Sequence, residues 1–187
     1  MAPEAMSRRA PGGSAGVRVF FALWPDAATT DALARIARRA VPPAARRMRP
    51  ATLHLTLAFV GDIDAARLPH LAAIGDDIVW PEPVFTFDHL GYWPHNHIVW
   101  AGSRQSPPVL ADLAGRLSDA LGAAGFSLPQ RTFTPHVTLA RKVVVQDWSA
   151  PRFEPVEWRI TGARLVLSQR TAAGASYRTL AHWTDTV

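Results

Sequence analysis

The sequence predicts an α+β protein with two pseudo-symmetric lobes of mostly antiparallel sheet, outer helices and a cleft between the lobes. Strand-like apolar runs alternate with amphipathic helices, and the tetrapeptide His54-Leu55-Thr56-Leu57 returns later as His136-Val137-Thr138-Leu139. If the chain is divided near residue 102, each half contains a helix followed by a strand that carries the motif. This repeated plan suggests a pseudo-twofold axis, which would bring the two motifs together across the cleft.

The predicted elements follow the hydrophobic periodicity and the turn residues of the chain. Asp26 is a good N-cap for a helix that runs to about Ala40, where Pro42 and Pro43 stop it. In the second half, leucines three and four residues apart predict another long helix. The expected strands are 17–23, 52–60, 84–90, 97–101, 135–141, 158–168 and 176–183, and the expected later helices are 65–74 and 107–124.

The composition limits the classes of function. The chain has 187 residues and is 48% hydrophobic, which predicts an ordered body with a real core. It has no Cys, which excludes disulfides, thiolate metal sites and a Cys nucleophile. The formal net charge is +5, and many arginines lie in the first quarter of the chain, including the Arg-rich segment 35–49. Arginine suits phosphate recognition, although the same residues are typical of a solvated surface.

We expect residues 1–16 to form a disordered tail and residues 17–187 to form a single bilobal domain. The tail is rich in Pro, Gly, Ser and Arg and lacks the apolar core of a signal peptide. No stretch approaches 18 consecutive apolar residues, so no membrane span is predicted. Without an export signal the cytoplasm is the expected compartment, and we expect a monomer.

Each motif offers one imidazole beside one hydroxyl. Because a strand has a period of two residues, His54 and Thr56 should point to one face, and the flanking leucines should point to the other. The second copy places His136 and Thr138 in the same way. An imidazole has an ordinary pKa of about 6.5 and can give or take a proton near neutrality. Two facing histidines could therefore do both at once.

The two motifs and the segments around them resemble the 2H phosphoesterase superfamily, and most closely the bacterial RNA 2′,3′-cyclic phosphodiesterases, also called 2′-5′ RNA ligases. The similar segments are VRVFFALWP, TLHLTLAFVG, IVWAG, FTPHVTLAR and LVLSQRTAAGASYRTL. The resemblance implies hydrolysis of RNA or nucleotide 2′,3′-cyclic phosphates to 2′-phosphates, with 2′-5′ ligation as the reverse activity. It also implies that no metal or cofactor takes part.

The resemblance further implies a role for each motif residue. His54 would be the proton donor and His136 the proton acceptor. The hydroxyls of Thr56 and Thr138 would bind the phosphate oxygens, where negative charge accumulates.

Further residues are candidates for substrate binding. Arg141 follows the second motif and could hold phosphate, although strict alternation would place it on the Leu139 face. Arg170 is another candidate for substrate binding. Tyr177 and Phe21, or its neighbour Phe20, could stack on a base, with core packing as the alternative for the two phenylalanines.

Other interpretations are weaker. His95-Asn96-His97 offers two histidines but no third metal ligand nearby. The chain contains no Walker A sequence and no G-x-G-x-x-G motif. The alternative function is a non-catalytic module that binds RNA ends. Two intact His-x-Thr pairs favour the enzyme, because binding alone does not require both imidazoles.

Overall fold

A computed structural model describes residues 16–129, 132–145, 147–171 and 174–184 of the protein. The expected tail lies outside these residues except for Gly16, which opens the first strand. The strands are β1 Gly16–Leu23, β2 Arg46–Arg47, β3 Leu55–Asp64, β4 Val84–Phe87, β5 His89–Trp93, β6 Ile98–Gly102, β7 His136–Arg141, β8 Val156–Arg159, β9 Ala163–Thr171 and β10 Gly174–Trp183. The α-helices are α1 Ala27–Ala40, α2 Leu68–Asp76 and α3 Pro108–Ala123.

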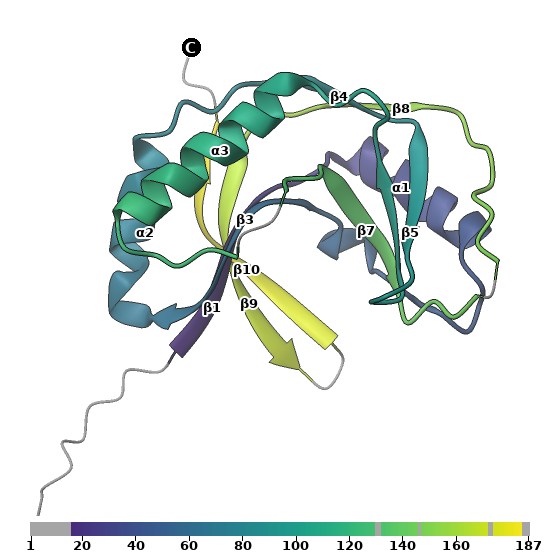
Figure 1. The fold of residues 1–187 in the computed structure, drawn as a ribbon, viewed down its shortest axis with the longest axis horizontal. Helices are drawn as coiled ribbons and strands as arrows, with labels where there is room; N and C mark the ends of the chain where they lie inside the picture. Colours follow the sequence, from purple (N-terminus) through teal and green to yellow (C-terminus); the bar gives the residue numbers. More distant parts are fainter. Residues whose placement is uncertain (1–15, 130–131, 146, 172–173, 185–187) are drawn as a thin grey trace, which may run out of the picture.

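One antiparallel sheet forms the frame of the molecule (Figure 1). In the described residues it has eight strands in the order β10-β9-β1-β3-β7-β6-β5, with β2 paired to β7. β3 and β7 carry the two motifs and meet at the centre of the sheet. β4 and β8 form a separate antiparallel pair. The α+β prediction is confirmed, and the two lobes are the two ends of one continuous sheet.

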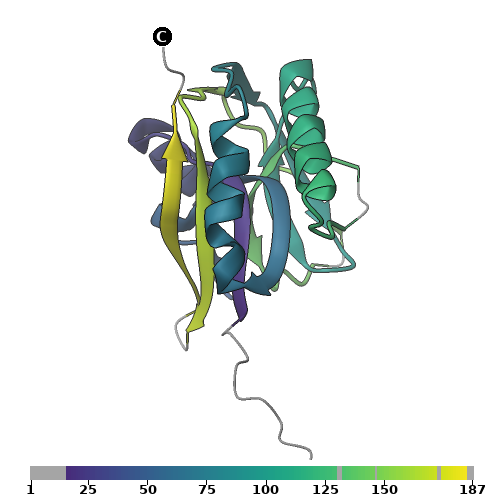
Figure 2. The ribbon, with the colours of Figure 1, turned by 90° about the vertical axis from the view of Figure 1, so that its left-hand side faces the viewer.

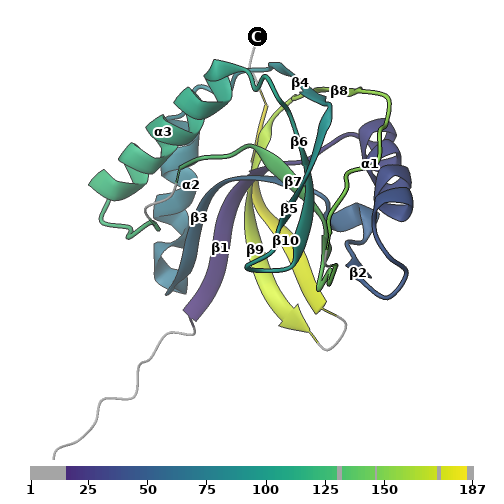
Figure 3. The same ribbon diagram turned by 45° about the vertical axis from the view of Figure 1, so that its right-hand side comes forward.

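The helices are exchanged between the two ends of the sheet. α1 follows β1 in the chain but packs against β7 and β8, whereas α3 precedes β7 but packs against β3 (Figures 1 and 3). Figure 2 shows α2 lying over the sheet, where it contacts β9 and β10. Each motif strand is therefore covered by a helix from the other half of the chain, and these two helices fix the position of β3 relative to β7.

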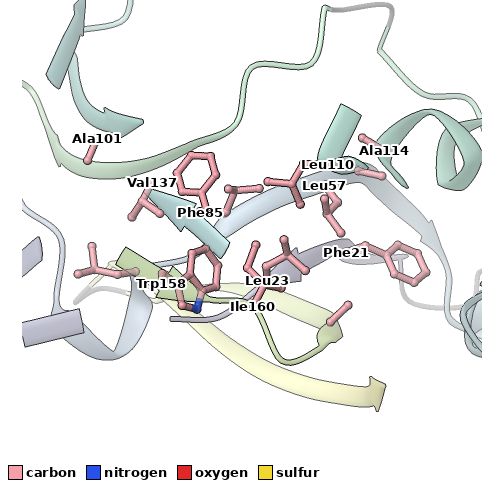
Figure 4. Close-up of a cluster of buried hydrophobic side chains, with 14 of the residues drawn as sticks. Phe21, Leu23, Leu57, Phe85, Ala101, Leu110, Ala114, Val137, Trp158 and Ile160 are labelled. Atoms are coloured by element: carbon pink, nitrogen blue, oxygen red, sulfur yellow. The ribbon is translucent and has the colours of Figure 1, made fainter. Parts of the chain in front are cut away.

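The main core lies between the helices and one face of the sheet (Figure 4). Phe21 and Leu23 of β1 point into this core, together with Leu110 of α3 and Trp158 of β8. The alternate residues of β1 point to the opposite face and form a second, smaller cluster, which contains Phe20, Ala22 and Val166. One face of the sheet therefore packs against the helices, and the opposite face is available for a functional site.

Local sequence signals explain where α1 and α2 begin. Asp26 caps α1 as predicted, because its Oδ1 accepts a hydrogen bond of 2.8 Å from the Thr29 amide. Pro69 lies in the first turn of α2, where a proline is tolerated because its missing N–H would have no helical partner.

Three predicted strands have different bounds in the structure. The strand expected over 52–60 begins only at Leu55, because residues 50–52 form a 3₁₀ turn, and it continues past Gly61 to Asp64. The strand expected over 84–90 is divided between β4 and β5, which belong to different sheets. The strand expected over 158–168 is likewise divided into β8 and β9. The chain turns between these two strands at Gly162, whose φ of +152° favours glycine.

Candidate active site

The two motifs meet at their second residues. β3 and β7 are joined by the single pair Leu55–Val137, and this antiparallel register places His54 opposite Thr138 and Thr56 opposite His136. The four polar side chains line one cavity of about 100 Å³, which has room for only a few water-sized groups. Met48, Thr52 and Arg141 complete its lining. The structure therefore brings both predicted His-x-Thr pairs to one place.

Both imidazoles are held through Nδ1 by a backbone carbonyl two residues earlier in the chain. Nδ1 of His54 lies 2.8 Å from the Thr52 oxygen, and Nδ1 of His136 lies 2.7 Å from the Thr134 oxygen. A carbonyl only accepts hydrogen bonds, so Nδ1 carries the hydrogen and donates it. This contact sets the tautomer and leaves Nε2 of each ring available to a ligand.

Aromatic rings fix the two imidazoles from their other sides. The Trp24 ring is stacked on His54 with centroids 4.9 Å apart, and Trp93 meets His136 edge-on at 4.6 Å. The additional rings are Phe20 and Tyr177 beside His54 and Trp100 beside His136. The two half-sites are thus built alike, each from a backbone carbonyl and neighbouring aromatic rings.

The surroundings of the cavity favour neutral imidazoles. Burial lowers the pKa of His54 to about 4; the hydrogen bond to Thr52 opposes this shift, and the charges of Arg141 and His136 add to it. Burial also lowers the pKa of His136, with the Thr134 hydrogen bond opposing and Arg141 adding to the shift. In the ligand-free protein both rings are therefore neutral at pH 7. An anion in the cavity would favour the protonated form and raise both pKa values.

These shifts predict the pH dependence of any reaction that needs one neutral and one protonated imidazole. Above the higher pKa both rings are neutral and the acid is lost, and below the lower pKa both are protonated and the base is lost. Because both values lie below the ordinary 6.5, kcat/KM should be bell-shaped with its maximum below pH 6.5. The maximum of kcat should lie at higher pH, because bound substrate is an anion.

Steady-state kinetics from pH 4 to 9 in phosphate-free buffers would check this prediction. The limbs belong to the coupled pair rather than to either residue. A kcat/KM maximum at or above pH 7 would contradict it.

Arg141 lies in the cavity, contrary to strict alternation along β7. The register shift between Val99 and Trp100 leaves Leu139 as an extra residue in β7, so both Leu139 and Ala140 are buried. This β-bulge returns Arg141 to the face that carries His136. A sequence pattern of period two does not reveal the bulge, because it arises from the pairing with β6.

The remaining candidates have different outcomes. Tyr177 lies at the site, with its ring edge-on to His54 at 5.1 Å. The proposal that Phe21 stacks on a base is wrong, because its side chain is fully buried against the stacked rings of Trp80 and Trp183. Phe20 faces the site, but it is also buried, and its ring contacts His54 rather than open space. Arg170 lies in β9 opposite Ala175, and its side chain lies outside the described residues.

Sequence reasoning missed several residues of the site. Trp24 and Trp93 are close to the motif histidines only through strand pairing, and nothing in their own sequence neighbourhood indicates it. The role of Thr52 could have been predicted, because the residue two positions before a strand histidine can accept a hydrogen bond from its Nδ1 through the backbone carbonyl. The Arg-rich segment also contributes, since Arg46 pairs with Arg141 in the sheet.

A wider pocket of about 800 Å³ opens beside His136. Trp93, His95 and Asn96 line it together with Arg141. His95 and Asn96 thus lie on the approach to the cavity. In the described part of the chain, no group of three or more His, Asp or Glu side chains is placed to hold a metal ion.

A shared sheet with a His-x-Thr strand from each half defines the two-histidine class of phosphoesterases. The profile of the family described as LigT like Phosphoesterase matches residues 23–100 and 102–177, which include both motifs. The chain belongs to this family.

Named relatives and solved structures agree with this assignment. The chain is 31% identical to an RNA 2′,3′-cyclic phosphodiesterase of Escherichia coli over 89% of this chain and 95% of the relative. It is also 31% identical to one of Thermus thermophilus, over 70% and 71%. The crystal structure of E. coli LigT complexed with 3′-AMP matches with a TM-score of 0.85 and 29% identity, over 92% of this chain and 100% of that chain.

None of the helices in the described residues is long and apolar enough to cross a membrane.

Proposed function

We propose that this protein is a phosphodiesterase that opens 2′,3′-cyclic phosphates at RNA ends or in small cyclic nucleotides and leaves a 2′-phosphate. The observation that carries the proposal is the cavity in which two imidazoles, two threonine hydroxyls and Arg141 converge. Relatives named RNA 2′,3′-cyclic phosphodiesterase over most of the chain support the same activity.

The proposed reaction uses the two Nε2 atoms that the backbone contacts leave available. His136 takes a proton from water, whose oxygen attacks phosphorus, and the bond from phosphorus to O3′ breaks. His54 gives its proton to O3′ as this oxygen leaves, so that protons and charge balance. The two half-sites have similar geometry, so the choice of His54 as the acid follows the family resemblance. With a 5′-hydroxyl in place of water, the same site would form a 2′-5′ linkage.

The other cavity residues would stabilise the charge of the phosphate. The hydroxyls of Thr56 and Thr138 would donate to the two non-bridging oxygens, and Arg141 would add a positive charge. The anionic substrate would in turn raise the low pKa of His54, which allows this ring to carry the proton that it must donate.

Both half-sites come from one chain, so we propose that a monomer is active and that residues 17–187 act as a single bilobal domain.

The test is incubation with 2′,3′-cyclic AMP and with an oligoribonucleotide that ends in a cyclic phosphate, in the presence of EDTA. We expect hydrolysis of both, with the 2′-phosphate as the product identified by chromatography. Activity that is lost in EDTA and returns with zinc or magnesium would refute the metal-independent mechanism. Release of a 3′-phosphate would refute the assignment of the leaving oxygen.

The same experiment separates the enzyme from an RNA-end-binding module. A double variant in which both motif histidines are alanine serves as the control for contaminating nucleases. If the wild type binds the oligonucleotide but releases no more product than the double variant, the binding module is the correct interpretation.

A further inference from the structure

Two arginines of the Arg-rich segment, Arg46 and Arg49, lie next to the cavity-lining residues Arg141 and Met48, and we call them the rim arginines. β2 pairs Arg46 with Arg141, and cross-strand partners in an antiparallel pair project to the same face with their Cβ atoms about 5 Å apart. Arg46 therefore projects beside Arg141, on the side of the site. Arg47 projects to the other side, where its Nη2 donates a hydrogen bond of 3.0 Å to the Val41 carbonyl. Neighbouring arginines in β2 thus have different surroundings.

The β9–β10 hairpin fixes the position of the two rim arginines. Nη2 of Arg49 donates a hydrogen bond of 2.9 Å to the carbonyl of Ala175. The guanidinium of Arg46 lies against Gly174, where any Cβ would overlap it. Gly174 also has a φ of +117°, which favours glycine. Both arginines are therefore held beside the strand that carries Tyr177.

The pKa of Tyr177 shows that these positive charges lie close to the site. Burial raises the pKa of its hydroxyl, and the charges of Arg141, Arg46 and Arg49 oppose that shift. The Tyr177 ring itself contacts His54. Positive charge therefore extends from the cavity, past Tyr177, to the rim.

Within the described residues, this row of charges has no carboxylate partner. Like charges directly opposite each other in a sheet are destabilising, yet Arg46 and Arg141 are cross-strand partners. No carboxylate in the described ranges forms a salt bridge with Arg46, Arg49 or Arg141. A guanidinium has five N–H donors, so one bond to a carbonyl leaves Arg49 able to bind an anion. The arrangement suits a ligand with a second negative charge beyond the one in the cavity.

We propose that Arg46 and Arg49 bind the phosphodiester on the 5′ side of the terminal nucleotide, so that the preferred substrate is the end of an RNA chain rather than a free cyclic nucleotide. This inference rests on the proposed function. An RNA chain carries its next charge one nucleoside away from the terminal cyclic phosphate, and a free 2′,3′-cyclic nucleoside phosphate has no such charge. With the cyclic phosphate beside Arg141, the adjacent Arg46 and Arg49 meet that second charge.

The test compares three substrates, of which the two dinucleotides differ only in the charge of this phosphate. They are adenosine 2′,3′-cyclic phosphate, the dinucleotide ApA with a terminal 2′,3′-cyclic phosphate, and the same dinucleotide with an uncharged methylphosphonate at its internal linkage. The variants are Arg46→Gln, Arg49→Gln and the double variant. Arg35→Gln, which removes an exposed charge from α1, is the matched control.

We expect the wild type to have a higher kcat/KM for the dinucleotide than for the mononucleotide. The double variant should lower this ratio by roughly tenfold or more, because charge-assisted hydrogen bonds to phosphate are lost. The methylphosphonate should lower the wild-type ratio to a similar extent and have little further effect on the double variant. Arg35→Gln should leave the ratio unchanged. Each ratio comes from one preparation, so it does not depend on the fraction of folded enzyme.

Two results would overturn the inference and leave the proposed function intact. One is a wild-type enzyme that hydrolyses the mononucleotide and both dinucleotides with equal kcat/KM. The other is an equal loss on all substrates in the double variant, which would show that the arginines only attach β2 to the hairpin. If the wild type hydrolyses none of the substrates, the proposed function fails, and this inference fails with it.

Discussion

Replacing His54 or His136 by alanine should lower kcat on a 2′,3′-cyclic phosphate by about 10²–10⁴-fold, which is the usual contribution of a general acid or base. Both imidazoles line the same cavity. In an in-line displacement the attacking water and the leaving O3′ lie on opposite sides of phosphorus, so one ring does not serve both oxygens. The two single variants should therefore be similarly impaired. Steady-state kinetics on 2′,3′-cyclic AMP would measure the loss.

Controls must separate catalysis from packing. The His54 ring is enclosed by Trp24, Phe20 and Tyr177, so alanine leaves a gap, and His54→Gln fills more of it without providing an acid. His182 is followed by Thr at the second position, as in the motifs, but it is exposed on β10. His182→Ala should keep full activity. A His54 or His136 variant that keeps near-full kcat would remove that residue from the mechanism.

The placement of the motif residues could be predicted because the strand period is strong in both copies. Leu55 and Leu57 are buried, as are Val137 and Leu139, while the His and Thr between them reach the cavity. The pairing of the two motifs was predicted from their repetition alone. What the repetition could not indicate is that α1 and α3 are exchanged between the lobes, because that depends on packing between distant segments.

The parts of the site that were missed depend on strand pairing. The position of Arg141 follows from a bulge against β6, and the contact of Phe20 rather than Phe21 with His54 follows from which face of β1 the helices cover. Trp93 reaches His136 from a strand more than 40 residues earlier in the chain. Local patterns carry no information on such long-range register, so residues of this kind become visible only in the structure.

Replacing Thr56 or Thr138 by valine should lower kcat by about 10²–10³-fold, the usual cost of losing one hydrogen-bond donor to a developing negative charge. Valine has the shape of threonine but cannot donate to the phosphate. Both threonines line the cavity beside a histidine, and neither carries a proton in the proposed reaction. The whole pH profile should therefore fall while its shape stays nearly unchanged.

The pH profiles distinguish the two roles. Loss of an oxyanion donor lowers the rate at every pH, whereas loss of a proton donor changes the shape of the pH profile, even where the two rate losses are of similar size. Thr56→Ser and Thr138→Ser keep the hydroxyl and should recover much of the rate. Thr179→Val, on an exposed position of β10, is the matched control and should have no effect. If either valine variant instead loses one limb of the bell, its hydroxyl takes part in proton transfer. The division of labour between imidazoles that move protons and threonines that hold charge would then be wrong.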